Sequence, residues 1–540
     1  MERTLSGILT KHSASEDIFL TNPVTRDSIS FHQFFLESKN ISQFIHDYGA
    51  KKGDRIAIYM ENGIEIATIF FGITYAGQVT VPVNFSYKSK EIRYLLEDAG
   101  VKYILTTKKI FTEKENILRE AFFRGQSDPT IYQYQIKESG QRDIVLIILS
   151  AQETEQDGAA DEAVKPLIDR QHNEAAPKHN DPVLPTEDDL ALILYTSGTT
   201  GNPKGVMLTH KNLIAETDNI TKAHRLTSQD VVLGVLPLFH INGLVITLIT
   251  PLAAGCEIIM PPKFSASNYW KWVEEYKVTW LNAVPTIYSI LLAKEQDPDI
   301  DTSHLRFARS ASSSLPAAVL EEFEARYHIP MIESYGISEG ASQITSNPLP
   351  PQKTKTGSVG LAYGNEVQIM DDLENILPPR ETGEIVVRGD NIALGYLNKP
   401  KETAEAFRNG WYHTGDMGYL DEEGYLFING RKKELINRAG EKFSPREIDE
   451  VLYQLPQVEL AAAVGVPNPL YNEEVVAYLK LREGQSLTEE EVIEFCKSRL
   501  ADFKAPKEIF FTDDFPKGPS GKIQRLKFVS RYEEEHQSSF

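Results

Sequence analysis

Apolar and polar residues alternate along the chain in runs that predict strands and helices in turn. Residues 55–59 are largely apolar and predict a strand, 64–76 carry apolar side chains at helical spacing, and 79–83 are largely apolar again. Strand, helix and strand at this spacing predict βαβ units around a parallel sheet. The pattern resumes with a predicted buried strand at 190–194 and continues past Pro400. We therefore expect a large layered α/β region.

A second pattern begins near Arg431 and mixes short helices with strands. The stretch Ser444-Pro-Arg-Glu447 predicts a capping box with proline at the first helical position. Thr488-Glu-Glu-Glu491 predicts a second capping box. Further signals are the apolar helix face formed by Ile448, Val451, Leu452 and Leu455, the predicted strands 461–466 and 475–481, and a second apolar stripe formed by Val492, Phe495, Cys496 and Leu500. A small α+β domain is expected here.

The length and local composition predict how the chain divides. A chain of 540 residues is too long for one hydrophobic core. Residues 152–189 are polar, acidic, rich in alanine and proline and without aromatics, which indicates a mobile surface insertion. We expect a large N-terminal α/β domain over 1–430, a hinge over 431–434 and a small mobile lid domain over 435–540. The expected fold class is multidomain α/β.

Charge and cysteine usage exclude several classes of function. Lysine and arginine number 56 against 77 acidic residues, and the net charge of −21 disfavours nucleic acid as a partner. Cys256 and Cys496 lie far apart in apolar settings, so we expect core residues rather than a disulfide or a metal site. The apolar stretch 243–260 contains Pro251 and Glu257, which favours a buried helix and a strand over a membrane span.

The two ends of the sequence bear on the expected compartment. Residues 1–17 show no apolar core of a signal peptide, and the last residues are not the S-K-L peroxisomal address. The cytoplasm is therefore the expected location. The sequence predicts no oligomeric state.

The loop after the strand at 190–194 has the composition of a phosphate site. It reads Tyr195-Thr-Ser-Gly-Thr-Thr-Gly-Asn-Pro-Lys-Gly-Val206. Glycines let the backbone approach a ligand closely, and backbone N–H groups, hydroxyls and one lysine can together hold a polyphosphate. The G-x-x-x-x-G-K-[ST] order of a Walker A loop is absent. The candidate ligands are Thr196, Ser197, Gly198, Thr199, Thr200, Gly201 and Lys204.

This loop resembles the phosphate loop of the adenylate-forming (AMP-binding) superfamily, which includes acyl-CoA synthetases, adenylation domains and luciferases. Three later stretches are similar to motifs of that superfamily and follow in its order. They are Tyr335-Gly-Ile-Ser-Glu339, Thr414-Gly-Asp416 and Pro516-Lys-Gly-Pro-Ser-Gly-Lys522-Ile-Gln-Arg525. The resemblance covers about residues 53–525, nearly the whole chain.

The resemblance implies nucleotide contacts for residues of the second and third motifs. Tyr335 would stack on the adenine ring beside Gly336, and Glu339 would bind Mg²⁺, which prefers oxygen ligands together with phosphate oxygens. Ser338 stands where threonine is usual, and it keeps a hydroxyl. An exposed turn is the alternative for this motif. Asp416 would accept hydrogen bonds from the ribose hydroxyls.

It also implies roles for residues around the hinge and in the lid. Arg431 would lie near the ribose or phosphate, and Lys433 would be the hinge between the domains, with a surface charge cluster as the alternative for 431–434. Lys522 would reach from the lid to the carboxylate and α-phosphate as negative charge shifts in the transition state. The expected catalytic residues are Lys522, Thr196, Glu339 and Lys433.

The stretch Leu236-Pro-Leu-Phe-His-Ile-Asn-Gly243 resembles the motif that begins the acyl pocket. His240 would gate the pocket, with a buried core histidine as the alternative. Amino-acid adenylation domains carry aspartate after the phenylalanine, so the histidine disfavours an α-amino acid substrate. The expected pocket residues are His240, Asn242, Gly243, Arg309, Ser312, Ser313 and Ser314.

Several segments are similar to a subgroup of peroxisomal-type CoA synthetases that includes the oxalyl-CoA synthetases. These segments are 309–315, 345–350, 433–442 and 495–497. A small dicarboxylate would need positive or hydrogen-bonding groups, which Arg309, the serine run, His240 and Asn242 could supply. An arginine beside a serine run is equally compatible with a structural role.

The expected function is an ATP-dependent carboxylate–CoA ligase that uses ATP, Mg²⁺ and CoA. A carboxylic acid would attack ATP, release pyrophosphate and form acyl-AMP, and CoA would then take the acyl group as a thioester. The alternatives are a stand-alone ligase that loads an acyl carrier protein, a ligase specific for a small dicarboxylate such as oxalate, and a binding protein that senses nucleotide without turnover.

Overall fold

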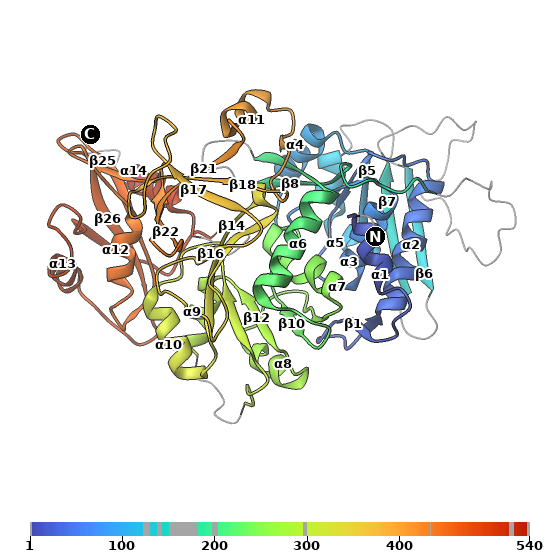
Figure 1. Cartoon of the computed structure of the whole chain (residues 1–540), viewed down its shortest axis with the longest axis horizontal. Helices are drawn as coiled ribbons and strands as arrows, with labels where there is room; N and C mark the ends of the chain where they lie inside the picture. Colours follow the sequence, from blue (N-terminus) through green and yellow to red (C-terminus); the bar gives the residue numbers. More distant parts are fainter. Residues whose placement is uncertain are drawn as a thin grey trace, which may run out of the picture.

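The computed structural model describes most of the chain as two large mixed sheets, a smaller sheet beside them and a C-terminal module at one end (Figure 1). The predicted insertion at 152–189 lies outside the described residues, apart from 182–189. The described residues are 3–122, 130–137, 143–150, 182–196, 203–294, 300–432, 434–517 and 523–536.

The first large sheet contains the strands predicted from apolar runs. Its centre is parallel, with β4 paired to β3 and to β8 and β3 paired to β5, and antiparallel strands lie at both edges. The βαβ unit predicted at 55–83 is confirmed, with helix α3 (Ile64–Tyr75) between β3 and β4. In spatial order the strands are β19 (Gly395–Tyr396), β9 (Lys204–Thr209), β8 (Leu190–Thr196), β4 (Val79–Pro82), β3 (Arg55–Ile58), β5 (Tyr103–Thr107), β7 (Asp143–Ser150) and β6 (Thr130–Lys137).

The second large sheet is also parallel at its centre and antiparallel at its ends. Strands β10 to β14 run parallel, and β14 then turns back into β15. In spatial order the strands are β16 (Leu361–Ala362), β15 (Ser342–Ser346), β14 (Met331–Ile337), β13 (Phe307–Ser310), β12 (Trp280–Ala283), β10 (Val231–Gly234), β11 (Glu257–Ile259), β1 (Ile18–Thr21) and β2 (Ser28–Ser30).

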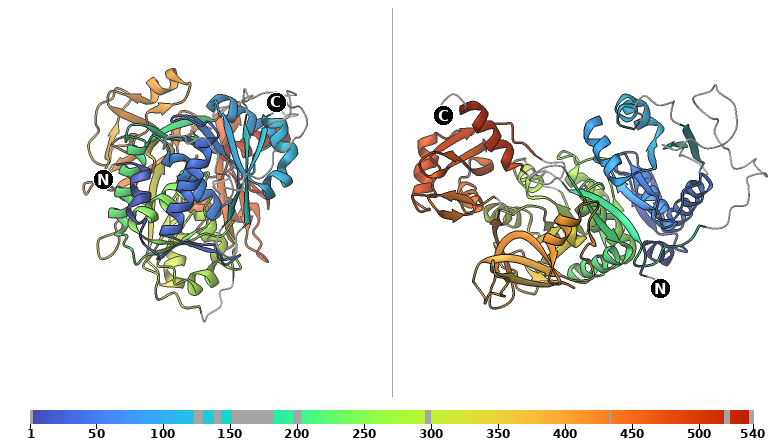
Figure 2. Two further views of the ribbon diagram at one scale, coloured as in Figure 1. Left: turned by 90° about the vertical axis from the view of Figure 1, so that its right-hand side faces the viewer. Right: turned by 90° about the horizontal axis from the view of Figure 1, so that it is seen from above.

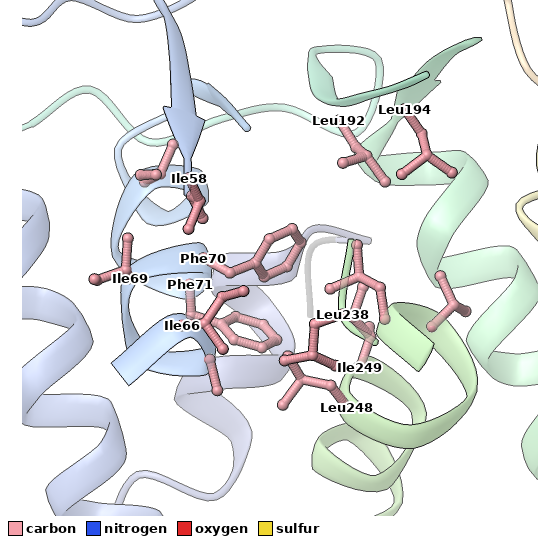
Figure 3. Packing of buried hydrophobic residues seen from close by; sticks show 14 of the residues in the cluster. Ile58, Ile66, Ile69, Phe70, Phe71, Leu192, Leu194, Leu238, Leu248 and Ile249 are labelled. Carbon is pink, nitrogen blue, oxygen red and sulfur yellow. The ribbon is translucent and has the colours of Figure 1, made fainter. Parts of the chain in front are cut away.

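Helices pack around the two sheets, and one core joins them. In Figure 3, Phe70 and Phe71 of α3 lie opposite Leu248 and Ile249, and all four side chains are buried. Burial of a large apolar side chain contributes roughly 1.5–3 kcal/mol, so this core fixes how the sheets meet. The other helices of this region are α1 (Leu5–Lys11), α2 (Phe31–Asp47), α4 (Ser89–Ala99), α5 (Lys108–Phe122), α6 (His210–His224), α8 (Tyr269–Glu275), α9 (Pro285–Leu292), α10 (Ala317–Tyr327) and α11 (Pro400–Ala406).

The apolar stretch 243–260 folds as predicted, with helix followed by strand. A π-helix η1 (Asn242–Ile249) continues into α7 (Thr250–Ala254), and β11 follows. Pro251 lies in the first turn of α7, directly after the π-helical segment. Among the described residues, no helix is long and apolar enough to cross a membrane.

A smaller sheet lies beside the two large sheets (Figure 1). It contains β17 (Glu366–Met370), β18 (Gly383–Arg388), β20 (Phe407–Arg408), β21 (Trp411–Leu420) and β22 (Leu426–Arg431). Strand β22 ends at Arg431, where the hinge is predicted to begin. The domain boundaries themselves stay predictions.

The C-terminal module has its own sheet and core, and Figure 2 shows it at one end of the molecule. Its elements are β23 (Ile436–Arg438), β24 (Glu441–Phe443), β25 (Val458–Asn468), β26 (Asn472–Leu481), β27 (Glu508–Phe511), α12 (Pro445–Leu452), α13 (Glu489–Lys497) and α14 (Arg525–His536).

Both free cysteines are buried, Cys256 in the large region and Cys496 in the C-terminal module. The capping box predicted at Thr488 is confirmed.

The capping box predicted at Ser444 is wrong, although Ser444 does cap the helix and Pro445 is its first residue, as predicted. The Ser444 hydroxyl accepts a hydrogen bond from the N–H of Arg446, so it does cap α12. Glu447 does not return the bond, because its carboxylate is paired with Lys504. An ion pair with a distant segment has replaced the local contact that the sequence predicts.

Candidate active site

A cavity of about 190 Å³ lies where the large region meets the C-terminal module. From the large region, its walls include the predicted nucleotide residues Tyr335, Gly336, Asp416 and Arg431 and the serines Ser312, Ser313 and Ser314. The C-terminal module contributes Arg446, Glu450 and Tyr453, together with Ile523 and Arg525. Motifs separated by more than two hundred residues therefore face one space.

Tyr335, Asp416 and Arg431 form one hydrogen-bonded group in this wall. The Tyr335 hydroxyl donates to Oδ2 of Asp416 at 2.5 Å, and Nε of Arg431 donates to Oδ1 at 2.9 Å. The charge of Asp416 is the largest cause that raises the pKa of Arg431, so this guanidinium stays charged. Burial raises the pKa of Tyr335. Asp416 is thus an oriented carboxylate, and each oxygen keeps a lone pair for a further donor.

Gly336 stands at a bulge between β14 and β15 where no side chain fits. A Cβ at this position would lie 1.6 Å from the carbonyl oxygen of Ser342. This close approach of two backbones lets β14 turn into the short helix η2 (Ser338–Gly340), which carries Glu339. The requirement for glycine here is steric.

Glu339 and Lys204 come together around one tyrosine that the sequence did not indicate. The Tyr396 hydroxyl donates to Oε1 of Glu339 at 2.7 Å, and Nζ of Lys204 lies 4.8 Å from the centre of the Tyr396 ring. Thr196 pairs with Lys204 across β8 and β9. The predicted residues Ser197, Gly198, Thr199, Thr200, Gly201, Lys433 and Lys522 lie outside the described residues.

The donors near Glu339 suit a magnesium ion that is shared with phosphate. Glu339 offers a carboxylate and Ser338 a hydroxyl, both oxygen ligands of the type Mg²⁺ prefers. Within the described ranges no group of three or more His, Cys, Asp or Glu side chains could hold a metal by itself. Phosphate oxygens and water would have to complete the coordination.

Arg309 lies behind the serine wall of the cavity rather than in it. Its side chain is 1% exposed and donates to Asn242 at 3.2 Å, to Asn282 at 2.8 Å and to Gln343 at 3.3 Å. Nδ2 of Asn242 in turn donates to the Ser312 hydroxyl at 2.9 Å. Burial lowers the pKa of Arg309 to about 10, so it is charged at neutral pH. Two hydrogen bonds therefore connect a buried cation to the cavity wall.

A buried acid, Glu216 of α6, stands on the far side of this network. Its carboxylate accepts hydrogen bonds from the backbone N–H of Gln343 at 2.6 Å and from Nδ2 of Asn391 at 2.9 Å. Burial raises the pKa of Glu216 well above its ordinary value despite these bonds and the charge of Arg309. The two groups act on each other, since the charge of Glu216 raises the pKa of Arg309 against the effect of burial.

His240 lies in a separate small cavity of about 30 Å³, beside Phe239 and Tyr195. Burial lowers the pKa of His240 to about 4, so the ring is neutral at physiological pH. Gly243 follows in η1, and a Cβ there would meet the carbonyl oxygen of Pro237 at 2.2 Å. His240 thus lines this small cavity, whereas Asn242, two residues on, contacts Ser312 in the wall of the first cavity.

A third cavity, of about 350 Å³, adjoins that of His240. The two cavities share Asn84 and Phe239 in their walls. The larger one lies where β3, β4, β10 and β11 end, and its lining includes Ser86, Phe264 and the exposed Lys263. Crevices at the carboxyl ends of parallel strands are common ligand sites in α/β proteins.

The C-terminal module closes the first cavity with side chains that sequence reasoning missed. Oε2 of Glu450 accepts from the N–H of Ala317 at 3.2 Å, and Arg446 donates to the carbonyl of Ile428 at 2.9 Å. Burial raises the pKa of Glu333, which lines the same cavity, to about 7, and the charge of Arg446 opposes this. Charged residues on an amphipathic helix gave no signal of this contact in the sequence.

Comparison with known proteins agrees with this architecture. The AMP-binding enzyme family model matches residues 11–397, and the AMP-binding enzyme C-terminal domain model matches 447–522. The sulfoacetate–CoA ligase of Cupriavidus necator is 36% identical over 98% of this chain and 97% of its own, and the oxalate–CoA ligase of Arabidopsis thaliana is 38% identical over 90% and 89%. The crystal structure of ATP-bound MatB from Rhodopseudomonas palustris superposes with a TM-score of 0.84 at 28% identity, covering 99% of this chain and 100% of MatB. The chain belongs to the AMP-binding enzyme family, as an ATP-dependent carboxylate–CoA ligase that uses Mg²⁺.

Proposed function

We propose that the carboxylic acid substrate is short and carries a second anionic group. The observation that carries this proposal is the buried Arg309 cation, held directly behind the serine wall by Asn242. A buried charge without a full counter-charge is costly, and an anion bound near it removes part of that cost. Sulfoacetate and oxalate, the acids in the names of the two relatives, both carry two acidic groups.

The neighbouring groups support an anion more than an apolar chain. The described hydrogen-bond partners of the Arg309 side chain are amide oxygens, which bear no charge. Ser312, Ser313 and Ser314 offer hydroxyl donors along the same wall. A long alkyl chain would leave these groups without hydrogen bonds.

We assign the remaining roles as follows. The loop at 196–204 with Lys204 holds the phosphates, Glu339 binds Mg²⁺ with phosphate oxygens, and Asp416 with Arg431 holds the ribose. Lys522 carries the adenylation step; its neighbour Ile523 lines the cavity, which supports this assignment. The lid turns about Lys433 between the two steps.

The cytoplasm is the compartment we propose.

We propose that CoA reaches the acyl adenylate through the cavity of about 350 Å³ at the strand ends. Its position beside the His240 cavity suits the flexible arm of CoA, and Lys263 could meet a phosphate at the surface. Ser86→Trp would fill the cavity, and we expect the KM for CoA to rise while adenylation stays unchanged. Both relatives named above are CoA ligases, so no comparison supports an acyl carrier protein.

The experiment is pyrophosphate release from purified protein with MgATP and single acids, with and without CoA. The acids are oxalate, malonate and sulfoacetate against acetate, hexanoate, palmitate and benzoate. We expect CoA-stimulated release with one or more acids of the first group. Release that is fastest with palmitate or benzoate would contradict the proposed substrate class.

A further inference from the structure

Tyr396 contacts two residues that have proposed roles at the nucleotide. They are Glu339, which would bind Mg²⁺, and Lys204, which would bind the phosphates. Tyr396 is 7% exposed and lies on β19, between Gly395 and the segment that leads into α11. Its hydroxyl donates to Glu339, and its ring lies under the ammonium of Lys204.

The backbone holds Tyr396 from both sides. Strand β19 pairs with β9, with Tyr396 opposite Val206, and the N–H of Leu397 donates to the carbonyl of Gly205 at 2.8 Å. The N–H of Tyr396 donates to the hydroxyl of Thr403 at 3.0 Å. The ring is therefore fixed to the same strand that begins with Lys204.

The two contacts act differently on the two charges. The hydroxyl occupies Oε1 of Glu339, and in the described part of the chain Oε2 has no hydrogen-bond partner, so one oxygen is oriented and one is left for a metal. An aromatic face attracts an ammonium without neutralising it. Lys204 forms no ion pair with any described residue, so a phosphate need not displace a carboxylate to reach it.

We propose that Tyr396 is a positioning residue for adenylation, which orients Glu339 toward Mg²⁺ through its hydroxyl and holds Lys204 toward the phosphates through its ring. The inference rests on the proposed roles of Glu339 and Lys204. It predicts that hydroxyl and ring have separable effects, one on the metal and the other on the nucleotide. A tyrosine that merely fills space would show no such separation.

The test is calorimetric binding of an ATP analogue with a methylene group between the α- and β-phosphorus atoms, without acid, in EDTA and over a series of Mg²⁺ concentrations. Loss of a group that orients a metal ligand typically costs about 10–100-fold in metal affinity. We therefore expect Tyr396→Phe to raise the Mg²⁺ concentration for half-maximal binding by about tenfold and to leave binding in EDTA unchanged. Tyr396→Leu should weaken binding in EDTA as well.

The matched control is Tyr478→Phe. Tyr478 is similarly buried, and its hydroxyl donates to the carbonyl of Phe528 at 3.4 Å in the C-terminal module rather than to the Glu339 carboxylate. It should leave both binding curves unchanged. Equal Mg²⁺ curves for wild type and Tyr396→Phe, with Glu339→Gln strongly shifted, would overturn the positioning role and keep the metal role of Glu339. An unshifted Glu339→Gln would overturn both.

Discussion

At the scale of single residues, Arg309 is a buried charge that is connected to the first cavity through Asn242 and Ser312, although it does not line that cavity. Its guanidinium donates to three amide side chains, which belong to β12, η1 and β15. One of them, Asn242, also donates to Ser312 in the cavity wall. Arginine presents a fixed fork of donors, so this arrangement holds the asparagines in defined orientations. The pocket assignment of Arg309 stays a prediction, and the structure gives it a specific form.

We predict that Arg309→Met lowers kcat/KM for an acid with two anionic groups relative to acetate by about 30-fold or more. Truncating one partner of a buried charge contact costs about 2–5 kcal/mol, and each 1.4 kcal/mol is tenfold. The ratio is insensitive to loss of folded enzyme. Arg306→Met, which removes an arginine paired with Asp230 elsewhere, should leave the ratio unchanged. An unchanged ratio in Arg309→Met would exclude Arg309 from acid selection.

Glu333 gives a prediction about pH and stability. Its pKa is raised to about 7 by burial, so between about pH 4.5 and 7 the folded protein binds more protons than the unfolded chain, and stability falls as pH rises. Glu333→Gln lacks this penalty. We expect the unfolding free energy of the variant, relative to wild type, to increase by roughly 3 kcal/mol from pH 4.5 to pH 8. Denaturant titration at both pH values checks this, and a constant difference would contradict the raised pKa.

At the scale of elements, strands and helices with a clear apolar period could be predicted, and contacts between distant segments could not. The unit at 55–83 was predicted correctly because its strands are largely apolar and nearly all their residues are buried. Strand β9 was missed because residues 204–209 begin with Lys-Gly and end with Thr. The network of Arg309 joins amides from three elements, and no spacing in the sequence brings those together.

In the candidate site, too, residues within recognisable motifs could be predicted, and residues defined by contacts between distant segments could not. The resemblance to the adenylate-forming superfamily implied that Tyr335, Gly336, Asp416 and Arg431 share one site, and all four line the same cavity. Tyr396 and Glu333 were missed, because what distinguishes them depends on residues far away in sequence. Tyr396 donates to Glu339, and Glu333 is buried near Arg446. A tyrosine after glycine or a glutamate in a buried strand carries no local signal of such a role.

The turn from β14 to η2 yields a prediction of its own. We expect Gly336→Ala to destabilise the protein by about 1–3 kcal/mol or more and to weaken ATP binding, because its Cβ would meet the backbone at Ser342. Gly234→Ala is the matched control, since a Cβ in that strand would have only ordinary contacts from 3.5 Å. Thermal unfolding and nucleotide titration of both variants check this. Equal behaviour of the two would contradict a steric requirement at Gly336.

At the scale of the whole molecule, we propose that the position of the C-terminal module decides which of the two steps the site performs. In this structure Arg446 and Glu450 of α12 contact the large region, and Ile523 lines the shared cavity. A single cavity with walls from two domains can change its catalytic groups when one domain turns.

We predict that Lys522→Ala blocks acyl-AMP formation but spares thioester formation from supplied acyl-AMP and CoA. Lys433→Pro should do the reverse, because proline fixes a backbone angle at the hinge. The two half-reactions are assayed separately, by pyrophosphate release and by thioester production. Equal loss of both steps in Lys522→Ala, or an intact second step in Lys433→Pro, would remove that residue from its role.

The most direct test of the proposed substrate class is a competition among acids in one reaction. The enzyme receives ATP, Mg²⁺, CoA and an equimolar mixture of oxalate, malonate, sulfoacetate, acetate, hexanoate and palmitate, and the thioesters formed are identified by mass spectrometry. We predict that thioesters of acids with a second anionic group dominate the products. Predominance of hexanoyl-CoA or palmitoyl-CoA would contradict a short substrate with two anionic groups.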